Sequence, residues 1–128
     1  MMEPVRVVVA DDHELLRGLI CKILASDPGI EVIDEASNGA EALEQVKIHN
    51  PDVLVSDLQM PVLNGVEVVE SVREEKLPVK VLLLSSPSDP YYAQSVMEIG
   101  ASGYLPKDEL YHELVDTVLQ VAGEKRHH

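Results

Sequence analysis

Short apolar runs alternate with segments of helical periodicity along the whole chain, and this alternation limits the folds open to it. The apolar runs have strand length and occupy residues 5–10, 30–36, 53–56, 79–84 and 103–105. Turn residues such as Asp27-Pro28-Gly29 separate helical segments from the runs that follow them. Because strands that alternate with helices pair in parallel, we expect an α/β sheet with helices on both faces.

Each helical segment carries an apolar stripe that predicts the face it turns toward the core. The stripes comprise Leu15, Leu16, Leu19, Ile20, Ile23 and Leu24; Ala42, Leu43 and Val46; Val66, Val68, Val69 and Val72; Ala93, Val96 and Met97; and Leu110, Leu114, Val115, Val118, Leu119 and Val121. Asp89, before Pro90, and Asp108 are expected to cap the last two helices. The fourth stripe is the weakest, so its helix is the element we expect to move.

One domain accounts for the length of 128 residues, and a hydrophobic fraction of 45% with a charged fraction of 26% is typical of a globular protein. We assign residues 1–124 to this domain and residues 125–128 to a tail, either a linker or a remnant of an engineered terminus. No apolar run approaches the roughly 20 residues that span a bilayer, and the N-terminus lacks the basic start of a signal peptide. The sequence therefore predicts a cytoplasmic protein without membrane contact.

A net charge of −13, from 10 Lys and Arg against 23 Asp and Glu, argues against direct nucleic-acid binding by this domain. Any DNA contact is expected in another domain or a partner. Cys21 is the single cysteine, which excludes an intramolecular disulfide and suits a reducing compartment. Because it lies in an apolar helical segment with no histidine in an obvious partner position, we interpret Cys21 as a packing residue.

Acidic side chains follow two of the predicted strands. Asp11 and Asp12 come directly after residues 5–10, and Asp57 follows residues 53–56. In a doubly wound sheet, ligands bind beside the carboxyl ends of the strands, so neighbouring strands would bring these carboxylates together. Taken singly, Asp12 is equally well explained as a helix cap, and Asp57 as a turn residue. Their convergence instead predicts a bound cation, because neighbouring like charges are unfavourable until something neutralises them.

Four fragments, in order, resemble the receiver domain of two-component response regulators, and the resemblance covers essentially the whole chain. They are Asp11-Asp12, the Asp-x-x-Met-Pro-x-x-x-Gly stretch from Asp57 to Gly65, Ser85-Ser86, and Lys107. The LuxR/NarL-like branch, whose members carry a C-terminal helix-turn-helix, has an opening similar to Ala10-Asp11-Asp12-His13-Glu14-Leu15-Leu16-Arg17. The resemblance implies a doubly wound, flavodoxin-like α/β/α fold with a five-stranded parallel sheet of order 2-1-3-4-5.

By this resemblance Asp57 is the phosphoacceptor, and Mg²⁺ (or Mn²⁺) is the cofactor. The implied metal-binding set is Asp11, acting through a bound water, with Asp12, Asp57 and the backbone carbonyl of Gln59. Hard oxygen ligands of this kind suit an octahedral shell that keeps several waters. Lys107 and Ser85 are the implied partners of phosphate oxygens, because a cation and a hydroxyl bind phosphate better than they bind Mg²⁺.

The resemblance also implies a switch and its partners. In receivers, the aromatic residue that matches Tyr104 changes orientation as the hydroxyl that matches Ser85 moves toward the phosphate. Gln59 and Pro87 flank the site and are implied to tune autodephosphorylation. The implied partners are a sensor histidine kinase, an output domain or downstream protein that regulates transcription, and a second copy of the chain that pairs on phosphorylation.

Other functions remain open at this point. One is a stand-alone regulator without an output domain. An aspartyl-nucleophile phosphatase would carry a second acid where this chain has Gln59. A flavodoxin-like cofactor-binding protein would need a Gly/Ser/Thr-rich phosphate loop in place of Asp11 and Asp12. A pseudo-receiver would lack residues that are all present here, so we expect a phosphoacceptor receiver whose only chemistry is self-catalysed.

Overall fold

The computed structural model describes residues 3–86 and 90–123, which contain a five-stranded sheet. The strands are β1 (Val5–Ala10), β2 (Ile30–Ala36), β3 (Val53–Asp57), β4 (Lys80–Ser85) and β5 (Gly103–Pro106). All neighbours pair in parallel in the order β2-β1-β3-β4-β5, which confirms the predicted fold class and strand order. The predicted bounds differ from the observed ones only at the ends of β3, β4 and β5.

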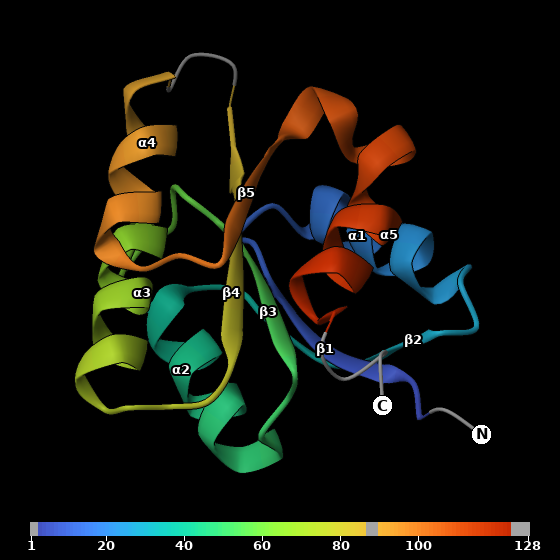
Figure 1. Ribbon diagram of the computed structural model, residues 1–128, viewed down its shortest axis with the longest axis horizontal. Coiled ribbons are helices and arrows are strands. Elements are labelled where there is room, and N and C mark those ends of the chain that lie inside the picture. Colours follow the sequence, from blue (N-terminus) through green and yellow to red (C-terminus); the bar gives the residue numbers. More distant parts are fainter. Residues whose placement is uncertain (1–2, 87–89, 124–128) are drawn as a thin grey trace.

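Helices cover both faces of the sheet (Figure 1). They are α1 (Glu14–Ala25), α2 (Gly39–His49), α3 (Gly65–Glu74), α4 (Pro90–Ile99) and α5 (Leu110–Val121), with a turn of 3-10 helix, η1 (Lys107–Glu109), before α5. Figure 1 shows α1 and α5 on one face and α2, α3 and α4 on the other. This reversal of winding makes the carboxyl ends of the strands a topological switch point. Within the described ranges no helix is long and apolar enough to cross a membrane.

Alternate residues of the central strands build two cores, one under each layer of helices. In β4, Val81 and Leu83 pack with α2, α3 and α4, whereas Leu82 and Leu84 pack with α1 and α5. All of these side chains are at most 3% exposed. Each fully buried leucine of this kind contributes about 1.5–3 kcal/mol. The almost wholly apolar sequence of β4 predicts burial on both faces, and the structure confirms it.

Local sequence explains where α2 and α3 begin. The Asn38 side chain accepts a hydrogen bond from Glu41 N–H at 2.8 Å. Asn64 and Glu67 form a reciprocal capping box, in which each side chain accepts from the other residue's N–H. These bonds satisfy amides that the first turn of a helix leaves without partners. The capping box also fixes the end of the loop after β3, which carries part of the predicted site.

Two side chains that the helical stripes predict to be buried are exposed. Leu15 is 92% and Met97 44% exposed, so both predictions are wrong. They lie at the edges of their stripes: the buried residues of α1 are Ile20 and Leu24, and Val96 is buried in the described part of α4. Helical periodicity thus identifies the correct faces but overestimates their width.

The start of α5 also differs from the prediction. Asp108 lies within η1, and the N-cap residue of α5 is Glu109, which makes no side-chain cap hydrogen bond. The 3-10 turn inserted before α5 therefore displaces Asp108 from the capping position. Pro90 is the first residue of α4, as predicted. Outside the described residues lie Pro87, Asp89, the side chain of Ala93, Glu124 and the predicted tail 125–128.

The loop between β3 and α3 contains a strained residue. Val62 has a φ of 70°, and Leu63 N–H donates to the Pro61 carbonyl across it at 2.8 Å. A γ-turn with positive φ is rare, and a β-branched side chain makes it less favourable still. Because the Val62 side chain is 71% exposed, packing contacts offset little of this strain.

Val62→Gly is therefore expected to raise the free energy of unfolding by about 0.5–1 kcal/mol. Relief of the left-handed conformation contributes about 1–2 kcal/mol, and the greater freedom of glycine in the unfolded chain offsets about 0.5–1 kcal/mol of it. Urea unfolding followed by circular dichroism measures the difference. Val62→Ala is the matched control, because it removes the branch and retains the unfavourable φ. A loss of stability in Val62→Gly would contradict the assignment of strain to this residue.

Candidate functional site

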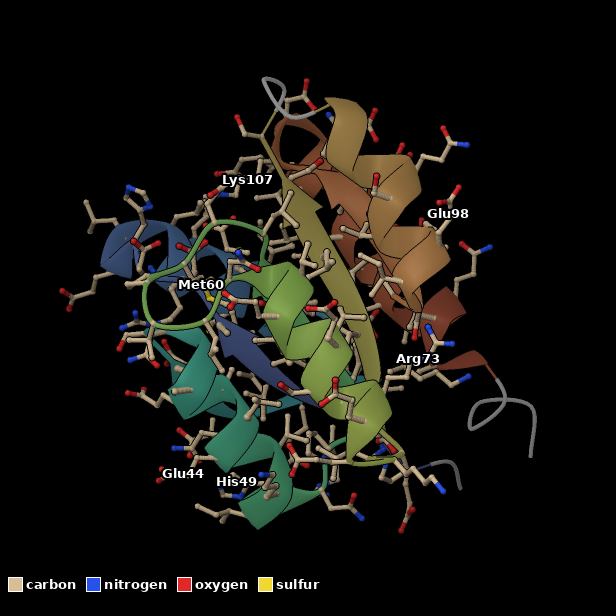
Figure 2. The ribbon with its side chains drawn as sticks, turned by 90° about the vertical axis from the view of Figure 1, so that its left-hand side faces the viewer. Glu44, His49, Met60, Arg73, Glu98 and Lys107 are labelled. Atoms are coloured by element: carbon tan, nitrogen blue, oxygen red, sulfur yellow. The ribbon has the colours of Figure 1, made fainter. Side chains whose placement is uncertain are left out.

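Predicted site residues lie where strands end, at the carboxyl edge of the sheet. Asp11 directly follows β1, Asp57 ends β3, Ser85 ends β4 and Lys107 begins η1. The parallel register aligns these ends through the pairs Ala10–Ser56, Asp57–Leu84 and Ser85–Pro106. Figure 2 shows Lys107 at this end of the molecule and His49, the last residue of α2, at the other. The fold thus gathers residues that are far apart in the sequence.

Asp11 is the most enclosed of the acidic residues. Its side chain is fully buried; Oδ1 accepts a hydrogen bond from His13 N–H at 2.8 Å, and Oδ2 has no hydrogen-bond partner within the described residues. Burial raises the pKa of the Asp11 carboxyl; the His13 amide opposes this effect, and the Asp57 charge adds to it. A buried carboxylate oxygen without a partner is unfavourable, so Oδ2 fits a site that a water or cation completes.

Lys107 pairs directly with Asp57. Its Nζ lies 3.0 Å from Asp57 Oδ2, and the Asp57 residue is 3% exposed. Asp57 Oδ1 accepts a longer hydrogen bond, of 3.3 Å, from Gln59 N–H. The Lys107 ammonium therefore neutralises part of the negative charge of the cluster, at the carboxylate that is predicted to react. Its flexible side chain allows the ammonium to keep this contact if the carboxylate oxygen moves.

A histidine joins the acidic cluster. Ligand atoms of Asp11, Asp12, His13 and Asp57 all lie within 4.8 Å of one another. His13 Nδ1 is 3.6 Å from Asp12 Oδ1 and 3.7 Å from Asp11 Oδ1. The sequence indicates that His13 belongs to the site only through its position directly after Asp11 and Asp12. It does not predict a role for this histidine. His13 is also the N-cap residue of α1, so the alternative of Asp12 as the cap is wrong.

The loop after β3 holds the backbone around Gln59. Leu58 N–H donates to the Leu84 carbonyl at 3.0 Å, and Gly65 N–H returns to the Leu58 carbonyl at 2.9 Å. A Cβ on Gly65 would lie 2.8 Å from the Asp57 carbonyl oxygen, so glycine permits this close approach. Gln59 thus directly follows a residue whose N–H and carbonyl are both hydrogen-bonded. The use of its carbonyl as a metal ligand stays a prediction.

The donor atoms of the cluster fit a hard divalent cation. Asp11, Asp12 and Asp57 supply carboxylate oxygens, which Mg²⁺ and Mn²⁺ prefer over nitrogen and sulfur ligands. Within the part of the chain that the structure describes, the buried Oδ2 of Asp11 has no partner, so it would be able to accept a hydrogen bond from a water on the cation. Exposed Asp12 leaves one side of the cluster open to solvent, as a cation that keeps several waters requires.

Comparison with known proteins agrees with this geometry. The response regulator receiver domain family matches residues 7–119. The chain belongs to this family. The receiver is 42% identical over 120 residues to the probable transcriptional regulatory protein NarL of Mycobacterium tuberculosis, across 94% of this chain and 56% of NarL. It is 39% identical over 115 residues to a protein-glutamate methylesterase/protein-glutamine glutaminase of Clostridium acetobutylicum, across 88% of this chain and 33% of that protein.

A solved structure supports the same assignment. The signal receiver domain of NarL from Mycobacterium tuberculosis superposes on this receiver with a TM-score of 0.90 and 41% sequence identity, covering 94% of this chain and 98% of that one. Against full-length NarL, by contrast, the chain spans 56% of the length. The matched region is therefore the receiver, and receivers of this sequence type occur in relatives with different outputs.

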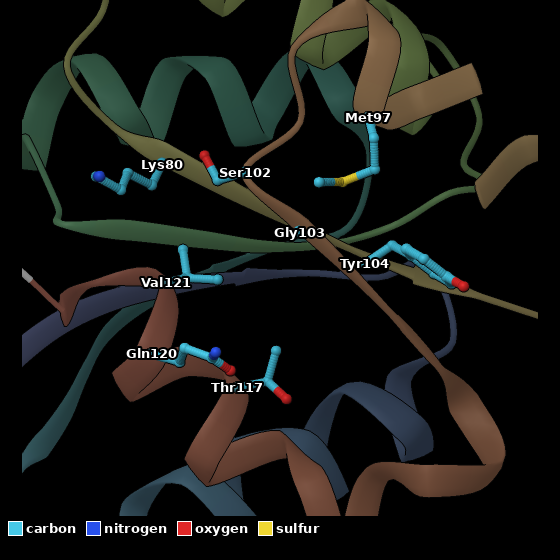
Figure 3. Close-up of a pocket in the computed structure, with 8 residues that line it drawn as sticks. All are labelled: Lys80, Met97, Ser102, Gly103, Tyr104, Thr117, Gln120 and Val121. Atoms are coloured by element: carbon cyan, nitrogen blue, oxygen red, sulfur yellow. The ribbon is translucent and has the colours of Figure 1, made fainter. Parts of the chain in front are cut away.

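Tyr104 lies on β5, among side chains from α4, β5 and α5 (Figure 3). Its side chain is 41% exposed. With Met97, Thr117 and Val121 it lines a hollow of about 580 Å³. The ring is thus turned outward in this structure, and its predicted change of orientation stays a prediction.

Proposed function

We propose that this receiver accepts a phosphoryl group on Asp57 from a sensor histidine kinase. The observation that carries the proposal is the 3.0 Å contact of Lys107 Nζ with Asp57 Oδ2, beside the buried carboxylate of Asp11 and the exposed one of Asp12. A carboxylate can attack phosphorus when the charge on the transferring oxygens is neutralised. The bond from phosphorus to the histidine nitrogen of the donor breaks as the bond to Asp57 forms.

Mg²⁺, or Mn²⁺ in its place, is the proposed cofactor. Asp12, Asp57 and the Gln59 carbonyl would hold it directly, and Asp11 would hold it through a water. When bound, the cation supplies neutralisation of the phosphoryl oxygens during in-line transfer. Asp11 and Asp12 then serve the metal, while Asp57 serves both as ligand and as acceptor.

Ser85 and Lys107 are the proposed partners of the phosphate oxygens that lie away from the metal. Ser85 is 7% exposed at the end of β4, beside the strand that ends in Asp57. Movement of Ser85 toward the phosphate is proposed to draw Tyr104 inward and so change the surface made by α4, β5 and α5. The outward ring and the hollow beside it are consistent with the unphosphorylated end of such a switch.

The proposed output is regulation of transcription by a DNA-binding domain, in a cytoplasmic protein that pairs with a second copy when phosphorylated. NarL of Mycobacterium tuberculosis and DegU of Brevibacillus brevis, which is 40% identical over 118 residues, are both transcriptional regulatory proteins by name. The net charge of −13 supports an arrangement in which DNA contact belongs outside the receiver. Reading the gene beyond His128 distinguishes this output from the methylesterase type.

Incubation with acetyl phosphate and Mg²⁺, followed by intact mass measurement, tests the phosphoacceptor. The wild type is expected to gain one phosphoryl group, and EDTA should abolish the gain. Asp57→Asn should show no adduct, because an amide of similar shape is not a comparable nucleophile. Asp116→Asn, at an exposed position on α5, is the control and should react like the wild type. An unmodified wild type, or an equal adduct on Asp57→Asn, would contradict the proposal.

A further inference from the structure

We propose that Arg17 is a positioning residue for the acidic site, an inference that rests on the proposed function. Arg17 lies on α1, and its guanidinium reaches back to the strand end that carries the acidic pair. Its Nη1 donates a hydrogen bond to the Asp11 carbonyl oxygen at 2.9 Å. Arg17 thereby holds the peptide unit that joins Asp11 to Asp12.

The other contacts of Asp11 show what this bond completes. Asp11 N–H donates to the Ala36 carbonyl at 3.0 Å, which extends the pairing of β1 with β2. Asp11 Oδ1 accepts from His13 N–H at 2.8 Å. The bond from Arg17 holds the remaining backbone group, the carbonyl. Within the described residues, Oδ2 is then the Asp11 oxygen without a partner, so the restrained backbone directs it into the site.

The same peptide unit sets the direction in which Asp12 leaves the strand. The Asp11 carbonyl and the Asp12 N–H lie in one plane, so holding the carbonyl also restrains the Asp12 Cα. Asp12 is exposed, and packing therefore restrains its carboxylate little. Its usefulness as a direct metal ligand depends on the backbone that Arg17 holds.

Arg17 is itself fixed from a second side. Its Nε donates to Glu35 Oε1 at 2.9 Å, and its side chain is 18% exposed. Glu35 lies on β2, opposite Val9 of β1 in the register. A guanidinium makes both bonds at once because its donors form a rigid fork, which the point charge of lysine does not reproduce. Arg17 thus ties α1 and β2 to the Asp11–Asp12 peptide.

The competing explanation is that Arg17 only stabilises the fold. Arg73 offers a matched control, because its Nη1 also donates to a backbone carbonyl, that of Ile99, at 2.7 Å. Figure 2 shows Arg73 well away from Lys107, which belongs to the site. Arg17→Met and Arg73→Met each remove a bond between a guanidinium and a carbonyl, but they differ in whether the acidic pair loses its support.

Calorimetric titration with Mg²⁺ separates the two explanations. Residues that orient metal ligands typically change affinity by about 10–100-fold, and we expect Arg17→Met to weaken Mg²⁺ binding by about tenfold. Arg73→Met should bind like the wild type. In EDTA, amide hydrogen exchange at His13 should be faster in Arg17→Met and unchanged in Arg73→Met, because the His13 N–H bonds to Asp11 Oδ1.

Wild-type Mg²⁺ affinity in Arg17→Met, or equal losses in both methionine variants, would overturn the positioning role while leaving the proposed function intact. A wild type that binds no Mg²⁺ would overturn both. If Arg17→Met does not fold, Glu35→Ala removes the anchor of Nε and should weaken binding in part. Glu35→Gln retains the Oε1 acceptor and should restore it. Full affinity in Glu35→Ala would then count against the role.

Discussion

Gly39→Ala is expected to lower the free energy of unfolding by about 3 kcal/mol, at the upper end of the range for overpacking. Gly39 is the first residue of α2, and a Cβ there would lie 2.0 Å from the Leu63 carbonyl oxygen and 2.6 Å from Leu63 Cβ. The nearest of these atoms is backbone, so rotation of a side chain cannot relieve the clash. Either α2 or the loop between β3 and α3 has to move.

The matched control for this substitution is Gly18→Ala. An added Cβ at Gly18 meets no atom within 4 Å, and alanine is favoured over glycine within a helix by about 1 kcal/mol. Urea unfolding should therefore show shifts of opposite sign for the two variants. Leu63 packs against the core and lies in the loop that carries Gln59, so Gly39→Ala should also weaken Mg²⁺ binding. A Gly39→Ala protein as stable as the wild type would contradict the close approach of α2 to this loop.

How far the fold can be predicted depends on how local the deciding contacts are. The run that forms β4 is almost wholly apolar, and burial on both faces is its natural consequence. The cap of α5 is different, because Asp108 fits the capping pattern but a 3-10 turn intervenes. The exposure of Leu15 likewise depends on how much of α1 the sheet and α5 cover. Periodicity identifies a face, whereas its width is set by tertiary packing.

The residues of the site also differ in how far the sequence predicts their contacts. Asp11, Asp57 and Lys107 follow strands, so a parallel sheet predicts that they converge, and the 3.0 Å contact of Lys107 with Asp57 agrees. Arg17 and its partner Glu35 could not be found in this manner. Their contact depends on how α1 packs beside the end of β2, because that packing brings the Arg17 side chain to Glu35. The spacing of residues in the sequence does not predict it. The roles themselves came from resemblance, and the supporting contacts came from the structure.

Asp11→Asn is expected to raise the free energy of unfolding in EDTA at neutral pH by on the order of 1 kcal/mol, because an unpaired buried charge is less favourable than an unpaired neutral group. Asparagine keeps an oxygen that can accept from His13 N–H and removes the charge that burial disfavours. It also removes the repulsion between Asp11 and Asp57. Asp12→Asn is the control, and it should change stability less because Asp12 is exposed.

The pH dependence of this difference follows from the raised pKa of Asp11. Between the pKa in the unfolded chain and the higher one in the folded state, the folded protein binds more protons, so wild-type stability falls as pH rises. Below the ordinary Asp pKa of about 3.9, both states are protonated and the advantage of Asp11→Asn should disappear. Saturating Mg²⁺ should reverse the order of stability of the two proteins at neutral pH. The wild type is expected to bind Mg²⁺ more tightly than Asp11→Asn, so Mg²⁺ stabilises its folded state more. Urea unfolding across this pH range, in EDTA and in Mg²⁺, measures both effects. If Asp11→Asn remains more stable than the wild type in acid, the result would contradict a burial penalty on the charged carboxylate.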